Sequence, residues 1–125
     1  MNTFKHFVNL YENRDTIDRF IKFCNKGLDI KNPCKVMFVD EPEEGMTTGC
    51  FDPINRDIKV LSGERALVDI LRSVAHELVH AKQHEDDRLT PGCGDDGHPI
   101  ENEANSLAGV IMRKFQRANR DVYSK

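Results

Sequence analysis

The chain has 125 residues, 38% of them hydrophobic and 31% charged, with a formal net charge of -3 and an isoelectric point near 5.9. This length and composition fit a single domain over residues 1–125 and exclude an intrinsically disordered chain. The acidic balance, without a basic stripe interleaved with aromatic residues, argues against binding to nucleic acid or to an anionic membrane. No segment has the length of a membrane span and the first residues form no export signal, so we expect a soluble, cytoplasmic protein.

The four cysteines, Cys24, Cys34, Cys50 and Cys93, lie too far apart to form a C-x-x-C pair, which argues against a zinc site built from thiolates. Without an export signal they are predicted to be reduced. We interpret Cys24 and Cys34 as core residues, and Cys93, in a polar loop, as an incidental exposed thiol.

The first predicted element is an amphipathic helix from Tyr11 to Gly27. Asp15 or Thr16 could cap its start, and Gly27 is a natural C-terminal end. The apolar positions at helical spacing are Ile17, Phe20, Ile21 and Cys24.

Short strands are predicted next. Lys35–Val39 is a β-rich run that predicts a core strand, and the acidic stretch Asp40–Gly45 is expected to be a solvated loop. Thr47–Phe51 and Arg56–Leu61 are two extended runs joined by turn-forming residues at 52–55, which predicts a hairpin.

A long helical pattern then runs from about Glu64 to Glu85, and Ser62 is a good candidate for its N-cap. His76 and His80 lie nearly opposite the apolar stripe, so this helix has a core face and a separate polar face. The stripe consists of Leu67, Ile70, Leu71, Val74, Leu78 and Ala81.

The polar face carries an H-E-x-x-H motif, His76-Glu77-Leu78-Val79-His80. Two histidines four residues apart on a helix can direct both imidazoles at one metal ion. Glu77 lies beside the coordination position that the protein leaves open, where its carboxylate can take a proton from a water molecule. The motif therefore predicts a catalytic zinc site.

A loop rich in glycine and proline leads to a last helix, which is predicted from Pro99 to about Ala118. His84 repeats the four-residue step from His80 but lies about one turn farther along, too far for the same ion, and is expected at the surface. The buried stripe of the last helix is predicted to consist of Ile100, Ala104, Leu107, Ala108, Ile111 and Phe115.

A catalytic zinc ion needs a third protein ligand, and the last helix offers two candidates. Glu101 lies closer to the apolar stripe than Glu103 and is therefore better placed to face inward. Asn105, one turn after Glu101, could hydrogen-bond a ligand histidine and fix its tautomer.

The loop before this helix offers alternative ligands, namely His98, Asp95 and Asp96. His98 could also stabilise an oxyanion or simply cap the last helix.

The order of these motifs resembles that of the gluzincin metallopeptidases, in which H-E-x-x-H is followed by E-x-x-A-D/N. Here the second pattern is matched by Glu101-Asn102-Glu103-Ala104-Asn105. The small ImmA/IrrE-like peptidases are similar over residues 101–108, apart from Leu107 in place of phenylalanine. Compact phage or bacterial metallopeptidases are equally good relatives.

The resemblance covers roughly Thr47 to Met112 and implies an α+β fold, a minimal zincin-like domain with a small, mostly antiparallel sheet. It implies that His76, His80 and Glu101 bind one Zn²⁺ ion and that Glu77 is the general base for peptide-bond hydrolysis. A polypeptide substrate would pair with the edge strand Thr47–Phe51.

The chain departs from the family in two ways. Ile111-Met112-Arg113-Lys114 replaces the usual leucine-methionine-proline ending, and no tyrosine or histidine is obviously placed for the oxyanion. The small size of the chain, which leaves only thin walls around a cleft, suggests a second hypothesis: a zinc-binding regulatory or protein-interaction module without catalytic activity.

Overall fold

A computed structural model describes residues 10, 12–89 and 98–120 of the chain. The order of elements in it is α1 (Arg14–Gly27), β1 (Lys35–Val39), β2 (Gly49–Asp52), β3 (Asp57–Leu61), α2 (Leu67–Glu85) and α3 (Pro99–Ala118). The predicted α+β class is therefore confirmed, and β1 has the predicted bounds.

The three strands form a mixed sheet in the order β1-β3-β2. β3 pairs in parallel with β1 and antiparallel with β2, so the expectation of a mostly antiparallel sheet was wrong. The predicted hairpin is present between β2 and β3, although β2 is Gly49–Asp52 rather than Thr47–Phe51. Residues 40–48 connect β1 to β2, and β3 then lies between these two strands. β3 suits the centre because its Ile58 and Val60 side chains are fully buried. β2 is consequently an edge strand.

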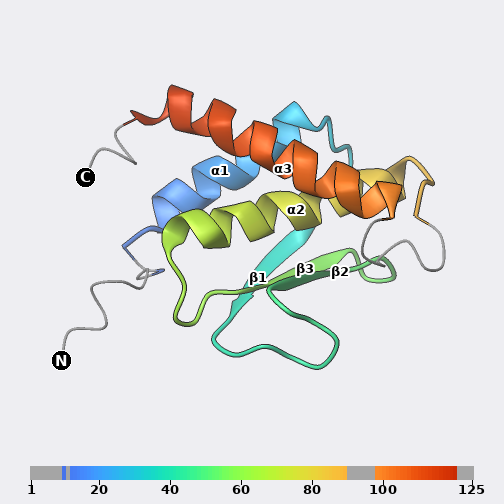
Figure 1. Ribbon diagram of the computed structural model, residues 1–125, viewed down its shortest axis with the longest axis horizontal. Helices are drawn as coiled ribbons and strands as arrows, with labels where there is room; N and C mark the ends of the chain where they lie inside the picture. Colours follow the sequence, from blue (N-terminus) through green and yellow to red (C-terminus); the bar gives the residue numbers. More distant parts are fainter. Residues whose placement is uncertain (1–9, 11, 90–97, 121–125) are drawn as a thin grey trace.

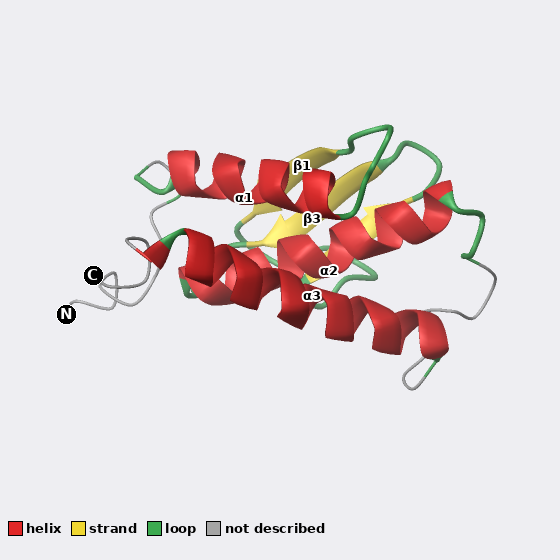
Figure 2. Cartoon of the chain, turned by 90° about the horizontal axis from the view of Figure 1, so that it is seen from above, coloured by secondary structure: helices red, strands yellow, loops and turns green. Residues whose placement is uncertain are grey.

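All three helices lie on the same side of the sheet (Figure 1). α2 contacts β2 and β3, and α1 and α3 pack on α2 and on each other, as the view from above shows (Figure 2). Phe20 of α1 meets Phe115 of α3 edge to face, with ring centroids 4.9 Å apart. Because α2 lies between the sheet and α3, side chains of α2 can meet both.

The helix starts differ in part from the predictions. α1 begins at Arg14, after Asn13, so Asp15 and Thr16 lie inside the helix rather than at its cap. α3 begins at Pro99, as predicted, and His98 caps it because its Nδ1 accepts a hydrogen bond of 3.1 Å from the N–H of Ile100.

α2 begins at Leu67, and Ser62 is not its N-cap. The N–H and the hydroxyl of Ser62 instead donate to the carbonyl oxygen of Val39, at 2.8 and 3.2 Å, which extends the pairing of β1 and β3. At Gly63 a side chain would overlap the backbone of Asp40, so this position needs glycine for the close approach of the two segments.

The buried faces of the helices follow the predicted stripes, with few exceptions. On α3, Leu107 is only half-buried, and Met112 is buried in addition to the predicted residues. Cys24, Cys34 and Cys50 are free thiols, and Cys24 is buried in the core; Cys93 lies outside the described residues. None of the helices in the described parts of the chain is long and apolar enough to cross a membrane.

Candidate metal centre and adjoining cleft

His76 and His80 lie one turn apart on α2 and direct their rings to the same point. Their Nε2 atoms are 3.1 Å apart, and the ring planes are nearly perpendicular, at 85°. The four-residue spacing alone brings the two nitrogens together, because a helix turns by about 40° more than one full turn over four residues.

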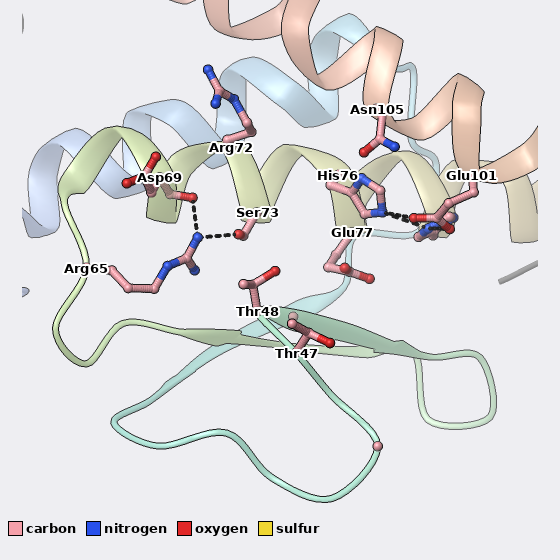
Figure 3. A pocket seen from close by; sticks show the side chains of 13 residues that line it. Thr47, Thr48, Arg65, Asp69, Arg72, Ser73, His76, Glu77, Glu101 and Asn105 are labelled. Atoms are coloured by element: carbon pink, nitrogen blue, oxygen red, sulfur yellow. Dashed lines mark hydrogen bonds and ion pairs between the residues drawn. The ribbon is translucent and has the colours of Figure 1, made fainter. Parts of the chain in front are cut away.

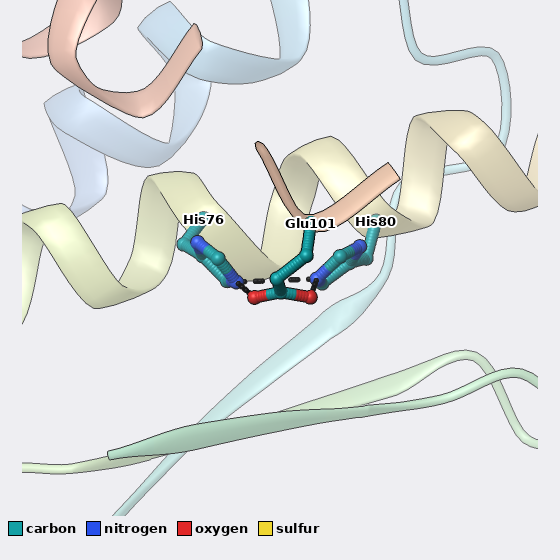
Figure 4. A group of neighbouring side chains, drawn as sticks. All are labelled: His76, His80 and Glu101. Carbon is teal, nitrogen blue, oxygen red and sulfur yellow. Dashed lines mark hydrogen bonds and ion pairs between the residues drawn. The ribbon is translucent and has the colours of Figure 1, made fainter. Parts of the chain in front are cut away.

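Glu101 reaches the same point from the first turn of α3 (Figure 4). Its Oε1 lies 2.6 Å from Nε2 of His76 and its Oε2 lies 3.1 Å from Nε2 of His80. Across the described residues, this is the one group of three histidine, cysteine or acidic side chains whose ligand atoms lie within 4.8 Å of one another. The two helices therefore bring together the three residues that the sequence analysis selected.

The distances suit a small divalent cation. Two ligands bound to Zn²⁺ at ~2.0–2.2 Å in a tetrahedron are about 3.3–3.5 Å apart, so the observed separations need only small outward shifts of the ligand atoms. A carboxylate facing imidazole nitrogens needs either a shared proton or a cation between them. The residues present therefore fit a bound metal ion.

Gln83, which is 1% exposed, fixes the tautomer of His80. Its side-chain Nε2 donates to the carbonyl oxygen of Ile100 at 3.1 Å and to Oε1 of Glu103 at 3.0 Å. The remaining amide oxygen, 2.8 Å from Nδ1 of His80, can only accept, so the proton of His80 is on Nδ1. The lone pair of His80 is thus on Nε2, the atom that faces Glu101.

Asn105 lines the cleft together with His76, and its side chain acts to raise the pKa of that histidine. Burial, together with the neighbouring His80, lowers the pKa of His76, although Glu101 and Asn105 oppose this effect. A lowered pKa favours the neutral imidazole, which is the form that binds metals.

Glu77 is 7% exposed, and its side chain lines a cleft beside the three ligand candidates. Burial raises the pKa of Glu77 to about 8, and the negative charge of Glu101 adds to the effect. A divalent cation at the three residues would act in the opposite direction and favour the carboxylate.

Gly49, the first residue of β2, allows Glu77 to occupy this place. A Cβ atom at Gly49 would lie 3.1 Å from Cγ and 3.2 Å from Oε2 of Glu77, and 3.3 Å from the carbonyl oxygen of Lys59. The edge of the sheet therefore approaches Glu77 as closely as a backbone without a side chain permits.

The cleft has a volume of about 680 Å³ and lies between α2 and the segment that leads into β2 (Figure 3). Its lining continues from the three ligand candidates toward the start of α2. The lining residues are Gly45, Thr47, Thr48, Gly49, Arg65, Asp69, Arg72, Ser73, His76, Glu77, His80, Glu101 and Asn105.

The structure assigns other positions to the remaining candidates. Glu103 points away from His76 and His80 and forms a bidentate ion pair with Arg88, with N–O distances of 2.7 and 2.9 Å. His98 caps α3, and Asp95 and Asp96 lie outside the described residues.

His84 was expected at the surface, but it is half-buried. Its Nδ1 lies 3.1 Å from the guanidinium of Arg56, and its ring packs edge to face against Phe51. It joins α2 to the β2–β3 hairpin.

Sequence reasoning missed three residues that shape the site, namely Gln83, Gly49 and Arg65. The signal for Gln83 was its position three residues after His80, on the same face of the helix. Gly49 and Arg65 carry no local signal, because their roles depend on the approach of β2 and of residues 62–66 to α2.

Comparison of the chain with protein-family models, with curated proteins and with solved structures gave no match.

Proposed function

We propose that the protein is a zinc-dependent metallopeptidase with a minimal gluzincin-like active site. The proposal rests on one observation: His76 and His80 of α2 and Glu101 of α3 direct their ligand atoms to one point beside the buried Glu77. This arrangement agrees with the order of the two sequence motifs. The assignment of the α+β domain to a zincin-like fold is part of the same proposal.

Zinc bound at this point would supply Lewis-acid chemistry, polarising the scissile carbonyl and making water more acidic. Glu77 acts as the general base, accepting a proton from the attacking water and delivering it to the leaving amine. Its position against Gly49 holds the carboxylate toward the cleft. Gln83 keeps the imidazole of His80 in a fixed orientation, and Asn105 lines the cleft beside His76.

A polypeptide in extended conformation is the substrate that the cleft suits best. β2 is an edge strand, and Thr47 and Thr48 line the cleft just before it. Among the residues that the structure describes, the backbone N–H and C=O of Thr47 form no hydrogen bond with another backbone group. An added strand could use these groups, as in β-strand addition.

The substitution Glu77→Gln tests the proposal. It should leave zinc bound at one equivalent and reduce cleavage of a mixed peptide library by about 10²- to 10⁴-fold, the usual contribution of a general base. Glu64→Gln, at an exposed carboxylate, is the matched control and should cleave like the wild type.

Full activity of the Glu77→Gln variant would refute the assigned role of Glu77. One equivalent of zinc without cleavage of any peptide by the wild type would instead favour a zinc-binding interaction module.

A further inference from the structure

Arg65 is a half-buried cation in the wall of the cleft, away from the metal centre. It donates to the carbonyl oxygen of Leu61 at 2.8 Å, to the backbone oxygen of Asp69 at 3.0 Å and to the hydroxyl of Ser73 at 2.9 Å. All three acceptors are uncharged, because the contact with Asp69 is to its backbone.

The positive charge of Arg65 is not neutralised by an ion pair within the described residues. Burial lowers its pKa, and only the charge of Asp69 opposes this effect. A guanidinium has five N–H groups, and the three bonds to described residues leave two of them, including Nε–H, without an acceptor in that part of the chain. These groups can receive a carboxylate.

Arg72 lines the same end of the cleft and adds a second positive charge there, although its guanidinium is directed away from Arg65 (Figure 3). It is exposed, and it too has no ion-pair partner among the described residues. Asp69 is the one carboxylate among the lining residues on this side of Ser73. The charge of this end is therefore net positive, whereas Glu77 and Glu101 occupy the other end.

The distance from Arg65 to the reacting centre corresponds to one or two substrate residues. Arg65 contacts Ser73, which precedes Glu77 by one turn of α2, about 6 Å along the axis (Figure 3). An extended peptide advances by about 3.3 Å per residue. The second residue from the scissile bond, or a long side chain on the first, would thus reach the guanidinium.

The direction of β2 decides on which side of the scissile bond these residues lie. β2 begins beside Glu77 at Gly49, and its Phe51 contacts His84, so it runs in the same general direction as α2. A peptide added antiparallel to β2, the more common pairing, runs in the opposite direction. Its residues after the scissile bond then approach Ser73 and Arg65.

We propose that Arg65 binds a carboxylate of the substrate at the first or second residue after the scissile bond, and that the charge of Arg72 adds a weaker, longer-range attraction. The inference rests on the proposed peptidase function and deepens it. The carboxylate is either an acidic side chain or the C-terminal carboxylate of the peptide. The enzyme would accordingly cleave before acidic residues or close to a C-terminus.

Paired peptides distinguish these sources. One pair has glutamate or glutamine at each of the two positions after the cleaved bond, with an amidated C-terminus. A second pair has glutamine there and ends two residues after the bond, with a free or an amidated C-terminus. For each peptide, kcat/KM is measured with the wild type and the arginine variants. Binding of each peptide is measured with the same proteins carrying Glu77→Gln, with and without zinc. Binding gives a result even when no peptide is cleaved, so failure of the proposed function is separate from failure of this inference.

We expect the wild type to prefer the carboxylate member of one pair by at least about tenfold, since hydrogen bonds to charged groups contribute ~1.5–3 kcal/mol. Arg65→Gln should reduce this ratio to near one, and Arg72→Gln should reduce it by about two- to fivefold. Arg72 is exposed, so its variant should fold even if loss of the Arg65 hydrogen bonds disturbs residues 62–66. Arg117→Gln, which removes the same charge from an exposed site near the end of α3, should retain the wild-type ratio.

Equal cleavage of both members of each pair overturns the inference. When no peptide is cleaved, equal binding of the members, or no binding, overturns it as well. A carboxylate preference that is as large in both arginine variants as in the wild type would also contradict the inference.

Discussion

At the scale of single residues, the orientation of His80 depends on Gln83. Replacing Gln83 with leucine removes the acceptor for Nδ1–H of His80 and the hydrogen bond from Gln83 to the carbonyl oxygen of Ile100. We expect zinc affinity to fall by about 10- to 100-fold, the usual effect of losing a residue that orients a ligand histidine. The measurement is a competition titration with a chelator, at a temperature where circular dichroism shows the variant to be folded.

Gln116→Leu, at an exposed position of α3, is the control and should bind zinc like the wild type. Wild-type affinity in the Gln83 variant would show that His80 is held by other means.

Gly49 determines the position of Glu77. A Cβ atom there would press on the side chain of Glu77 and on the backbone of Lys59, so Gly49→Ala should displace the carboxylate. We predict that kcat for peptide cleavage falls by at least about tenfold while zinc remains bound, because misplacement of a catalytic group by a fraction of an ångström is costly.

Gly27→Ala is the matched control, since a Cβ atom at Gly27 meets no atom within 4 Å. Equal activity of the two glycine variants would contradict the assigned role of Gly49.

At the scale of elements, Arg88 and Glu103 join the segment after α2 to the first turns of α3. Hydrogen bonds from Arg88, and then from Gln83, hold the pKa of Glu103 below its usual range. A carboxyl group whose pKa is lowered by folding stabilises the protein above its unfolded pKa of about 4.3. This contribution is lost as the pH falls through the folded-state pKa.

We therefore expect the free energy of unfolding of the zinc-free protein to fall less steeply between about pH 6 and pH 3 in Glu103→Gln than in the wild type. Urea titrations at several pH values measure the difference. Parallel curves for the two proteins would show that the ion pair contributes no net stability.

Elements with strong local signals were predicted well. Gly27 ends α1, Pro99 starts α3 and the β-rich run 35–39 is β1, because turn formers and hydrophobic periodicity act over a few residues. The start of α2 was placed too early, since Ser62 looks like a cap but is taken by the carbonyl of Val39. The parallel pairing of β1 with β3 had no local signal, because the two strands are separated by the whole of β2.

At the scale of the molecule, the candidate site forms where α2 meets both the sheet and α3. The choice of Glu101 over Glu103 as the third ligand could be predicted, because Glu101 lies closer than Glu103 to the apolar stripe of α3. The cleft could not be predicted, because Gly49 and Arg65 reach it through the approach of segments distant in sequence.

The measurement that tests the central claim most directly compares zinc binding by Glu101→Gln and Glu103→Gln. These residues lie two positions apart on α3, but Glu101 alone of the two directs its carboxylate to His76 and His80. Chelator competition at neutral pH should give one equivalent of tightly bound zinc for the wild type and Glu103→Gln, and at least about 100-fold weaker binding for Glu101→Gln, which loses a charged ligand. Wild-type zinc binding by Glu101→Gln, or no zinc binding by the wild type, would contradict the metal centre proposed for this protein.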